Sequence, residues 1–182
     1  MKRHSVFLAA VVVVCSPLAV QSAEVEVKGV HMCCGQCVKI IAKTLGKVEG
    51  VSDAACDRKA KTIKFKADDA KVAKKALRRL TNAGFFGKAA IDGKAAKLPA
   101  SGAKKDQKSD SIAIRNVHLC CGLCVKAVTK ALKAVEGVEG VAPNRKKNTV
   151  QLIGKQFDVT AAIAALNKAG FNGRVGKRKK EK

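Results

Sequence analysis

One segment of the sequence occurs twice, and this internal repeat constrains the fold more than any other feature. Residues 33–37 are Cys-Cys-Gly-Gln-Cys, and residues 120–124 are Cys-Cys-Gly-Leu-Cys, a shift of 87 positions. The same shift aligns the residues on both sides of the cysteines, and it falls to 86 near the end of each copy, where one loop residue is lost. A chain of 182 residues with such a repeat predicts two small domains of the same fold.

Hydrophobic periodicity predicts the same order of elements in both copies. An alternating run precedes the cysteines at residues 25–28 and 112–115, which is typical of a strand. Apolar residues at helical spacing follow the cysteines and indicate an amphipathic helix: Val38, Ile41, Leu45 and Val48, repeated as Val125, Val128, Leu132 and Val135. Two strands, a second helix and a last strand complete each copy. This order predicts an α+β fold of two tandem ferredoxin-like (βαββαβ) domains, each an antiparallel four-stranded sheet with two helices on one face.

The N-terminal residues predict export. Lys2-Arg3 precedes an apolar run at residues 6–14 that is too short to span a bilayer, and small residues follow where a signal peptidase would cleave, after Ser22 or Ala23. We therefore expect a periplasmic or secreted mature protein that does not span the membrane. The predicted parts are a signal peptide (1–23), a first domain (24–92), a flexible linker (93–111), a second domain (112–176) and a basic disordered tail (177–182).

The charge balance is strongly basic, with 37 Lys and Arg against 14 Asp and Glu. Such a surface attracts nucleic acid, anionic lipid or acidic proteins. The sequence contains no Trp or Tyr that could stack on bases, and it has no helix-turn-helix or zinc-finger spacing. We do not expect specific nucleic-acid binding, although a basic nucleic-acid or surface-binding protein stays as an alternative. An acidic metal-acceptor or transporter protein would fit this charge.

The repeated cysteines predict a metal site. Each copy has a CxxC pair at the start of a predicted helix, where free backbone N–H groups and the helix dipole stabilise thiolates. Thiolates are the ligands that soft ions such as Cu(I) or Hg(II) prefer. The candidate ligands are the four CxxC thiols and one adjacent thiol in each copy: Cys34, Cys37, Cys121 and Cys124, then Cys33 and Cys120.

The cysteine turn resembles the metal-binding loop of the heavy-metal-associated domain family, found in copper chaperones, copper-transporting ATPases and periplasmic mercury-binding proteins. The family motif is Gly-Met-(Thr or His)-Cys-x-x-Cys, placed between the first strand and first helix of a ferredoxin-like fold. Met32 matches the family methionine, and Leu119 takes its place in the second copy. The Gly-Phe pairs at residues 84–85 and 170–171 resemble the family's Gly-Tyr or Gly-Phe near the metal loop. The resemblance covers both copies and implies Cu(I) binding by the CxxC thiols.

Two positions depart from the family motif. Cys33 and Cys120 stand at the Thr or His position, and His31 and His118 stand at the glycine. A third thiolate favours trigonal coordination, and a histidine could complete a Cys₃His site for Zn(II). We expect Cu(I), with Hg(II) and Zn(II) as alternatives. Ligation by these four residues is left open, as is the question whether the two domains share one ion.

No constellation of residues suggests an enzyme. The sequence lacks a carboxylate pair beside a nucleophile, a Walker-type glycine loop and a catalytic His-Asp partner for the thiols. Cys-Gly-x-Cys also resembles redox motifs, so a periplasmic thiol–disulfide redox protein is an alternative, but the thioredoxin-like pattern is missing. The expected function is an exported carrier, scavenger or buffer of a soft metal ion.

Overall fold

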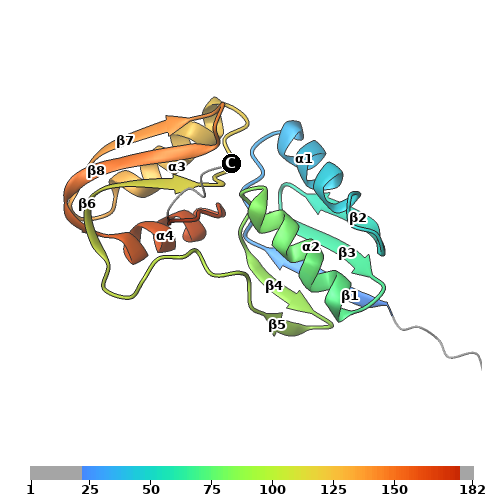
Figure 1. The fold of residues 1–182 in the computed structure, drawn as a ribbon. Coiled ribbons are helices and arrows are strands. Elements are labelled where there is room, and N and C mark those ends of the chain that lie inside the picture. Colours follow the sequence, from blue (N-terminus) through green and yellow to red (C-terminus); the bar gives the residue numbers. More distant parts are fainter. Residues whose placement is uncertain (1–21, 177–182) are drawn as a thin grey trace, which may run out of the picture.

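Two α+β domains of similar topology account for residues 22–176, the part of the chain that the computed structural model describes (Figure 1). The first domain consists of β1 (Ala23–Lys28), α1 (Gly35–Leu45), β2 (Val51–Asp57), β3 (Thr62–Ala67), α2 (Ala70–Asn82), β4 (Lys88–Ile91) and β5 (Lys94–Ala96). The second consists of β6 (Lys108–Arg115), α3 (Gly122–Lys133), β7 (Val138–Asn144), β8 (Thr149–Asp158) and α4 (Val159–Lys168). The predicted α+β class and ferredoxin-like order are confirmed.

The first sheet has the strand order β2-β3-β1-β4-β5, and every neighbouring pair is antiparallel. In the register, Val27 of β1 faces Ile63 of β3 on one side and Ala89 of β4 on the other. Val25 and Val27 are buried because alternate side chains of a strand point to the same face. The predicted four strands are present, and β5 adds a fifth at the edge.

The second sheet has three strands in the order β6-β8-β7, one fewer than predicted. The predicted last strand forms two isolated bridges instead of a ladder. Arg174 exchanges two backbone hydrogen bonds of 2.9 Å with Arg115, and Phe171 pairs with Phe85 of the first domain. Other backbone groups of this segment are used elsewhere. The Val175 N–H donates to the Ser101 carbonyl, and the Asn172 N–H donates to the Gly84 carbonyl in the first domain. A longer strand ladder is therefore not formed.

The segment predicted as a flexible linker, residues 93–111, includes short regular elements. It contains β5 and the first residues of β6, and it is tied to the second domain by hydrogen bonds from Val175 N–H to Ser101 and from Val159 N–H to Gln107, both 2.9 Å. Polar composition alone did not reveal these backbone pairings. The predicted tail and all but the last two residues of the predicted signal peptide lie outside the described residues, and Ala23 is buried in β1.

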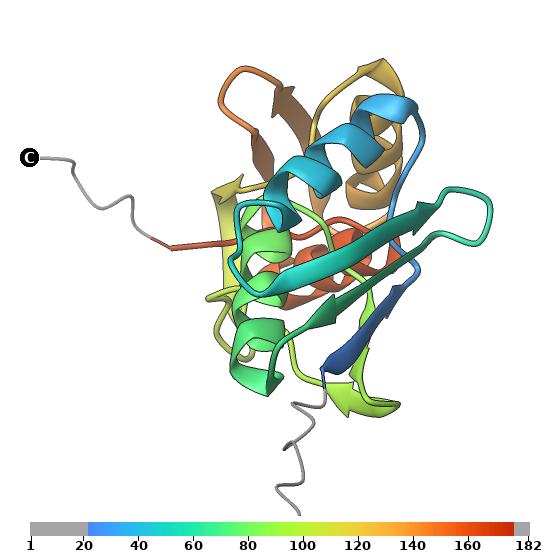
Figure 2. The same ribbon diagram turned by 90° about the vertical axis from the view of Figure 1, so that its right-hand side faces the viewer.

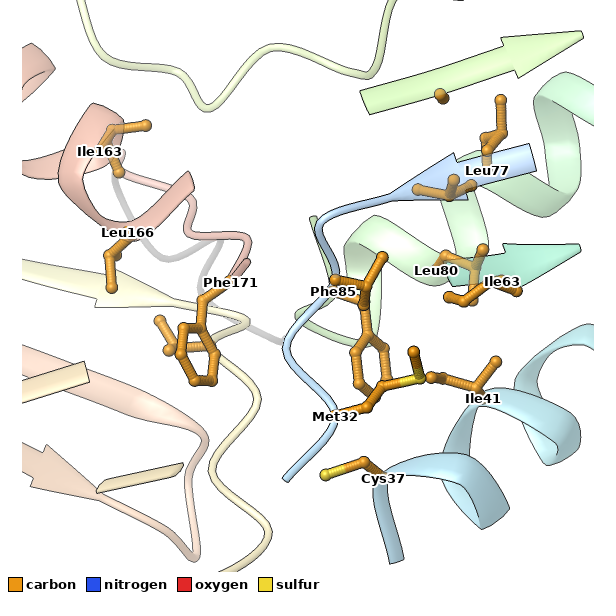
Figure 3. Close-up of a cluster of buried hydrophobic side chains, with 14 of the residues drawn as sticks. Met32, Cys37, Ile41, Ile63, Leu77, Leu80, Phe85, Ile163, Leu166 and Phe171 are labelled. Carbon is orange, nitrogen blue, oxygen red and sulfur yellow. The ribbon is translucent and has the colours of Figure 1, made fainter. Parts of the chain in front are cut away.

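The buried hydrophobic residues of both domains belong to one continuous cluster. Figure 3 shows Ile41, Ile63 and Leu80 around Phe85 in the first domain, and Leu166 beside Phe171 in the second. Asp69 and Asp158 accept backbone hydrogen bonds at the N-termini of α2 and α4, as N-cap residues do. Within residues 22–176 we find no helix with the length and apolar character needed to cross a membrane.

Candidate metal centre

The two domains dock through equivalent segments of the repeat. The first domain lies in front of the second in the view of Figure 2, and Phe85 pairs with Phe171 in an antiparallel bridge between them. The Gly170 carbonyl accepts from the N–H groups of His31 and Phe86, both at 3.2 Å, and the Asn172 N–H donates to the Gly84 carbonyl at 2.9 Å. Because equivalent segments meet each other, this contact resembles the interface of a two-fold symmetric dimer.

Two ring contacts repeat the same symmetry. The His31 ring stacks on Phe171 with centroids 4.3 Å apart, and the His118 ring lies against Phe85 at 4.2 Å. Phe85 and Phe171 are buried, and each contacts the histidine of the other domain. The Asn172 side-chain amide adds a buried hydrogen bond of 2.8 Å to the Thr81 carbonyl.

Glycine is required at the centre of this interface. Gly84 and Gly170 have φ angles of +90° and +86°, a region that L side chains rarely adopt. A Cβ at Gly84 would lie 2.2 Å from the backbone nitrogen of His118, and one at Gly170 would lie 2.4 Å from the backbone nitrogen of His31. The Gly-Phe pairs noted in the sequence therefore permit close approach of the two backbones.

The docking brings both cysteine loops together. Cys34 and Cys121 are the N-cap residues of α1 and α3, with extended backbones and no side-chain capping bond, so their thiols are available to a ligand. Cys37 and Cys124 lie in the first turns of these helices and are fully buried, whereas the other four site thiols are half-buried. In Figure 3 the Cys37 sulfur points from α1 toward the second domain. All six predicted ligands thus meet at the domain boundary.

Sulfur–sulfur distances across the boundary equal those within a domain. The cross-domain Sγ pairs are Cys33–Cys121 at 3.4 Å, Cys33–Cys124 at 3.5 Å, Cys37–Cys120 at 3.6 Å and Cys34–Cys120 at 3.9 Å. The pairs within one domain are Cys120–Cys124 at 3.5 Å, Cys33–Cys37 and Cys34–Cys37 at 3.8 Å, and Cys121–Cys124 at 3.9 Å. These cysteines are free thiols, since a disulfide bond would be about 2.05 Å long.

The close packing lowers the pKa of two of these thiols and raises the pKa of three others. A hydrogen bond from Cys124 lowers the pKa of Cys37 to about 2, and backbone N–H groups at the start of α3 lower that of Cys121 to about 6. Burial raises the pKa of Cys33 to about 12 and also raises that of Cys120, while the hydrogen bond to Cys37 raises that of Cys124. Three thiols therefore keep their protons until a cation replaces them.

Two arginines that the sequence analysis did not assign to the site hold the cysteine loops. The Arg58 guanidinium donates to the Cys33 carbonyl at 2.8 Å, and Arg145 donates to the Cys120 carbonyl at 2.7 Å. Arg58 and Arg145 are separated by the same 87 positions as the cysteines, so the repeat itself carried the signal. Each arginine therefore fixes the backbone of one cysteine loop and places a positive charge beside it.

His31 and His118 contact the opposite domain and do not belong to the groups of possible metal ligands. Among the described residues, two groups of possible metal ligands form at the boundary, and both consist of cysteines alone. The Nε2 atoms of His31 and His118 are buried without a hydrogen-bond partner in the described part of the chain, although His118 contributes to the low pKa of Cys37. The Cys₃His arrangement considered for Zn(II) is thus not what this geometry forms. Met32 and Leu119 are buried under the loops, and Cys56 lies half-buried in β2.

Residues 24–86 and 112–172 match the family described as Heavy-metal-associated domain. Over 146 residues the chain is 31% identical to Copper-transporting ATPase 2 of Rhizobium meliloti (strain 1021), an alignment that covers 77% of this chain and 15% of that protein. Oxidized MerP from Ralstonia metallidurans CH34 is 20% identical with a TM-score of 0.35, over 39% of this chain and all of that one. The N-terminal soluble domains of Bacillus subtilis CopA are 18% identical with a TM-score of 0.33, over 88% of this chain and 98% of that one.

Proposed function

The chain belongs to the heavy-metal-associated domain family, and on that basis we propose that it binds Cu(I) through its cysteine thiolates as an exported metal carrier, scavenger or buffer. The observation that carries the proposal is the convergence of six free thiols at one partly buried site. Thiolate sulfur prefers soft ions, and the backbone N–H groups at the start of α3 favour the ionised form of Cys121.

Cu(I) is the preferred ion within this proposal. Its preference for thiolate ligands fits a site made of cysteines alone, and the 31% identical relative is a copper-transporting ATPase by name. Hg(II) and Zn(II) also bind thiolates and are the competing ions to test. We propose a binding and transfer role rather than catalysis, with an acidic acceptor or transporter as the partner that a basic chain of net charge +23 would attract.

A chelator competition under anaerobic conditions tests the proposal. Reduced protein is titrated with Cu(I) against a colorimetric Cu(I) chelator, and Zn(II) and Hg(II) are compared in the same way. The variant C34S/C37S/C121S/C124S should lose tight Cu(I) binding, because two thiols remain where six were present. Cys56→Ser is the matched control: it removes a half-buried thiol outside the site and should leave Cu(I) affinity unchanged.

Equal Cu(I) affinity of the quadruple variant and the wild type, with unchanged far-UV circular dichroism, would contradict the proposed site. If the wild type instead reduces insulin catalytically and retains no metal, the thiol–disulfide redox alternative is favoured.

Export is tested on the full chain. Expression in a bacterium, followed by fractionation and N-terminal sequencing, should give a periplasmic or secreted protein that begins at Ala23 or Glu24. Recovery of an uncleaved chain from the cytoplasm would contradict the export part of the proposal and leave the metal site untouched.

A further inference from the structure

We infer that the six thiols form one shared site for two soft metal ions, in which Cys33 and Cys120 bridge the ions and each ion is held by both domains. This inference rests on the proposed function and extends it, since a heavy-metal-associated domain with one CxxC pair needs no second domain to hold an ion. It also gives a role to the cysteines at which the chain departs from the family motif.

The thiols fall into two overlapping groups of four. One group consists of Cys33, Cys34, Cys120 and Cys121, and the other of Cys33, Cys37, Cys120 and Cys124; the sulfurs within each group lie within 4.8 Å of one another. Cys33 and Cys120 belong to both groups, and each group takes two thiols from each domain. A thiolate shared by two adjacent ligand sets is in the position of a bridging ligand.

The spacing of the sulfurs fits metal coordination across the boundary. Four ligands at a metal–sulfur distance of about 2.3 Å in a tetrahedron are separated from each other by about 3.8 Å. The cross-domain Sγ pairs span 3.4–3.9 Å, which brackets this value. Within the first CxxC pair, Cys34 and Cys37 are 3.8 Å apart, so a thiol of the other domain is as well placed for a shared ion as the CxxC partner.

The site is assembled by contacts that do not involve sulfur. The Phe85–Phe171 bridge, the hydrogen bonds of Gly84 and Gly170 and the two His–Phe ring contacts hold the loops face to face. Preorganisation of this kind lowers the entropic cost of binding, because the ions need not draw two separate domains together. Each S–H that becomes a ligand releases its proton to solvent. Two Cu(I) ions balance two of the six thiolate charges, and Arg58 and Arg145 bring two further positive charges to the cysteine loops.

The two groups differ in access. The group with Cys37 and Cys124 contains the two fully buried thiols, and the group with Cys34 and Cys121 contains only half-buried ones. An ion therefore reaches the inner group past the outer one. Occupation of the first group fixes both bridging thiolates in place for the second ion, which predicts positive cooperativity between the two ions.

The test is native mass spectrometry of the reduced full chain during titration with Cu(I) held by an acetonitrile or chelator buffer. At half loading, the wild type should show mainly chains with no ion and chains with two ions. The fraction of chains with one ion should lie well below the binomial value expected for two independent sites. X-ray absorption of the loaded protein should contain a copper–copper scattering contribution. Cys33→Ser/Cys120→Ser keeps both CxxC pairs but should weaken binding of the second ion about 5- to 150-fold, the usual range of coupling between sites.

A second variant changes the docking and leaves every thiol in place. Gly84→Ala/Gly170→Ala puts a Cβ against the backbone of the opposite domain and should restore a binomial distribution without copper–copper scattering. Gly93→Ala is its control, because Gly93 also has a positive φ, +73°, but its Cβ would meet nothing within 4 Å. That variant should load like the wild type.

The outcomes separate this inference from the proposed function. A binomial distribution in the wild type that neither double variant changes, with no copper–copper scattering, would overturn the shared site and leave two independent CxxC sites. A wild-type chain that captures no Cu(I) from the buffer would overturn the proposed function itself.

Discussion

Replacing Gly170 by alanine should separate the two domains of the metal-free protein. The residue has a φ of +86°, and an added Cβ would lie 2.4 Å from the His31 nitrogen, 2.7 Å from the Gly29 oxygen and 3.0 Å from the Val30 carbonyl carbon. All three are backbone atoms of the other domain, so no side-chain rotation can relieve the overlap. The domains must move apart for the variant to fold.

The expected loss of stability has two parts. The left-handed backbone costs about 1–2 kcal/mol for a residue with a Cβ, in Gly170→Ala and equally in the control Gly93→Ala. Separation also removes the hydrogen bonds from His31, Phe86 and Asn172 described above, four in all at 2.8–3.2 Å. At about 0.5–1.5 kcal/mol net for each bond, Gly170→Ala should lose about 2–6 kcal/mol more than its control. The two ring contacts would add about 1–3 kcal/mol.

Urea denaturation followed by far-UV circular dichroism measures this difference, since the chain has no Trp or Tyr for fluorescence. Small-angle X-ray scattering should show a larger radius of gyration for Gly170→Ala than for the wild type or Gly93→Ala. Gly84→Ala should also lower the urea midpoint and increase the radius of gyration, because its Cβ would lie 2.2 Å from the backbone nitrogen of His118. If Gly170→Ala unfolds at the same urea concentration as Gly93→Ala and keeps the wild-type radius of gyration, the docking argument is refuted.

Three further predictions concern the cysteine loops and a helix cap. The variant Arg58→Gln/Arg145→Gln should weaken Cu(I) binding about tenfold, because it loses the hydrogen bonds to the loop carbonyls. The control Arg78→Gln, on the exposed face of α2, should leave Cu(I) binding unchanged. A chelator competition measures both affinities. In the metal-free protein, half-buried Cys121, with its pKa of about 6, should be alkylated at neutral pH well before Cys33, with its pKa of about 12, as peptide mass mapping would show; simultaneous labelling would contradict the assigned pKa order. The side-chain hydrogen bond from Thr160 lowers the pKa of Asp158 in the folded state, so its stabilisation of α4 is present above the ordinary aspartate pKa and is lost as the pH falls through the folded value. Asp158→Asn should therefore flatten the acid limb of the urea-midpoint profile, and an unchanged acid limb would contradict this role.

The fold of each domain was predictable because its signals are local. Apolar spacing at Val38, Ile41 and Leu45 gave α1, and its repetition 87 residues later gave α3. The number of strands was less predictable, since it depends on pairings between distant residues. Val175 donates to Ser101 rather than extending a ladder beside β6, and neither residue carries a sequence signal for this bond.

The six thiols were predictable as candidates, but their meeting at one boundary was not. Each copy of the repeat specifies a loop with three cysteines, whereas the relative placement of two copies depends on how their surfaces fit. The decisive features are the glycines at residues 84 and 170, whose backbones pass within contact distance of the opposite loop. A Gly-Phe pair in one domain gives no indication of that neighbour until both copies are considered together.

The positions that depart from the family motif have a common explanation in the interface. Both lie on the cysteine loops and both contact the opposite domain: the rings of His31 and His118 pack on its phenylalanine, and the sulfurs of Cys33 and Cys120 approach its thiols at 3.4–3.9 Å. A domain that binds its ion alone gains nothing from either substitution, because neither residue is needed for a CxxC site. In two domains that share their ions both residues have a role: the histidine holds the two loops face to face, and the extra thiol belongs to both ligand groups. Restoring the family's glycine at His31 and His118 should therefore weaken docking and abolish cooperative Cu(I) loading together, while a loss of docking with cooperative loading intact would show that the two departures are unrelated.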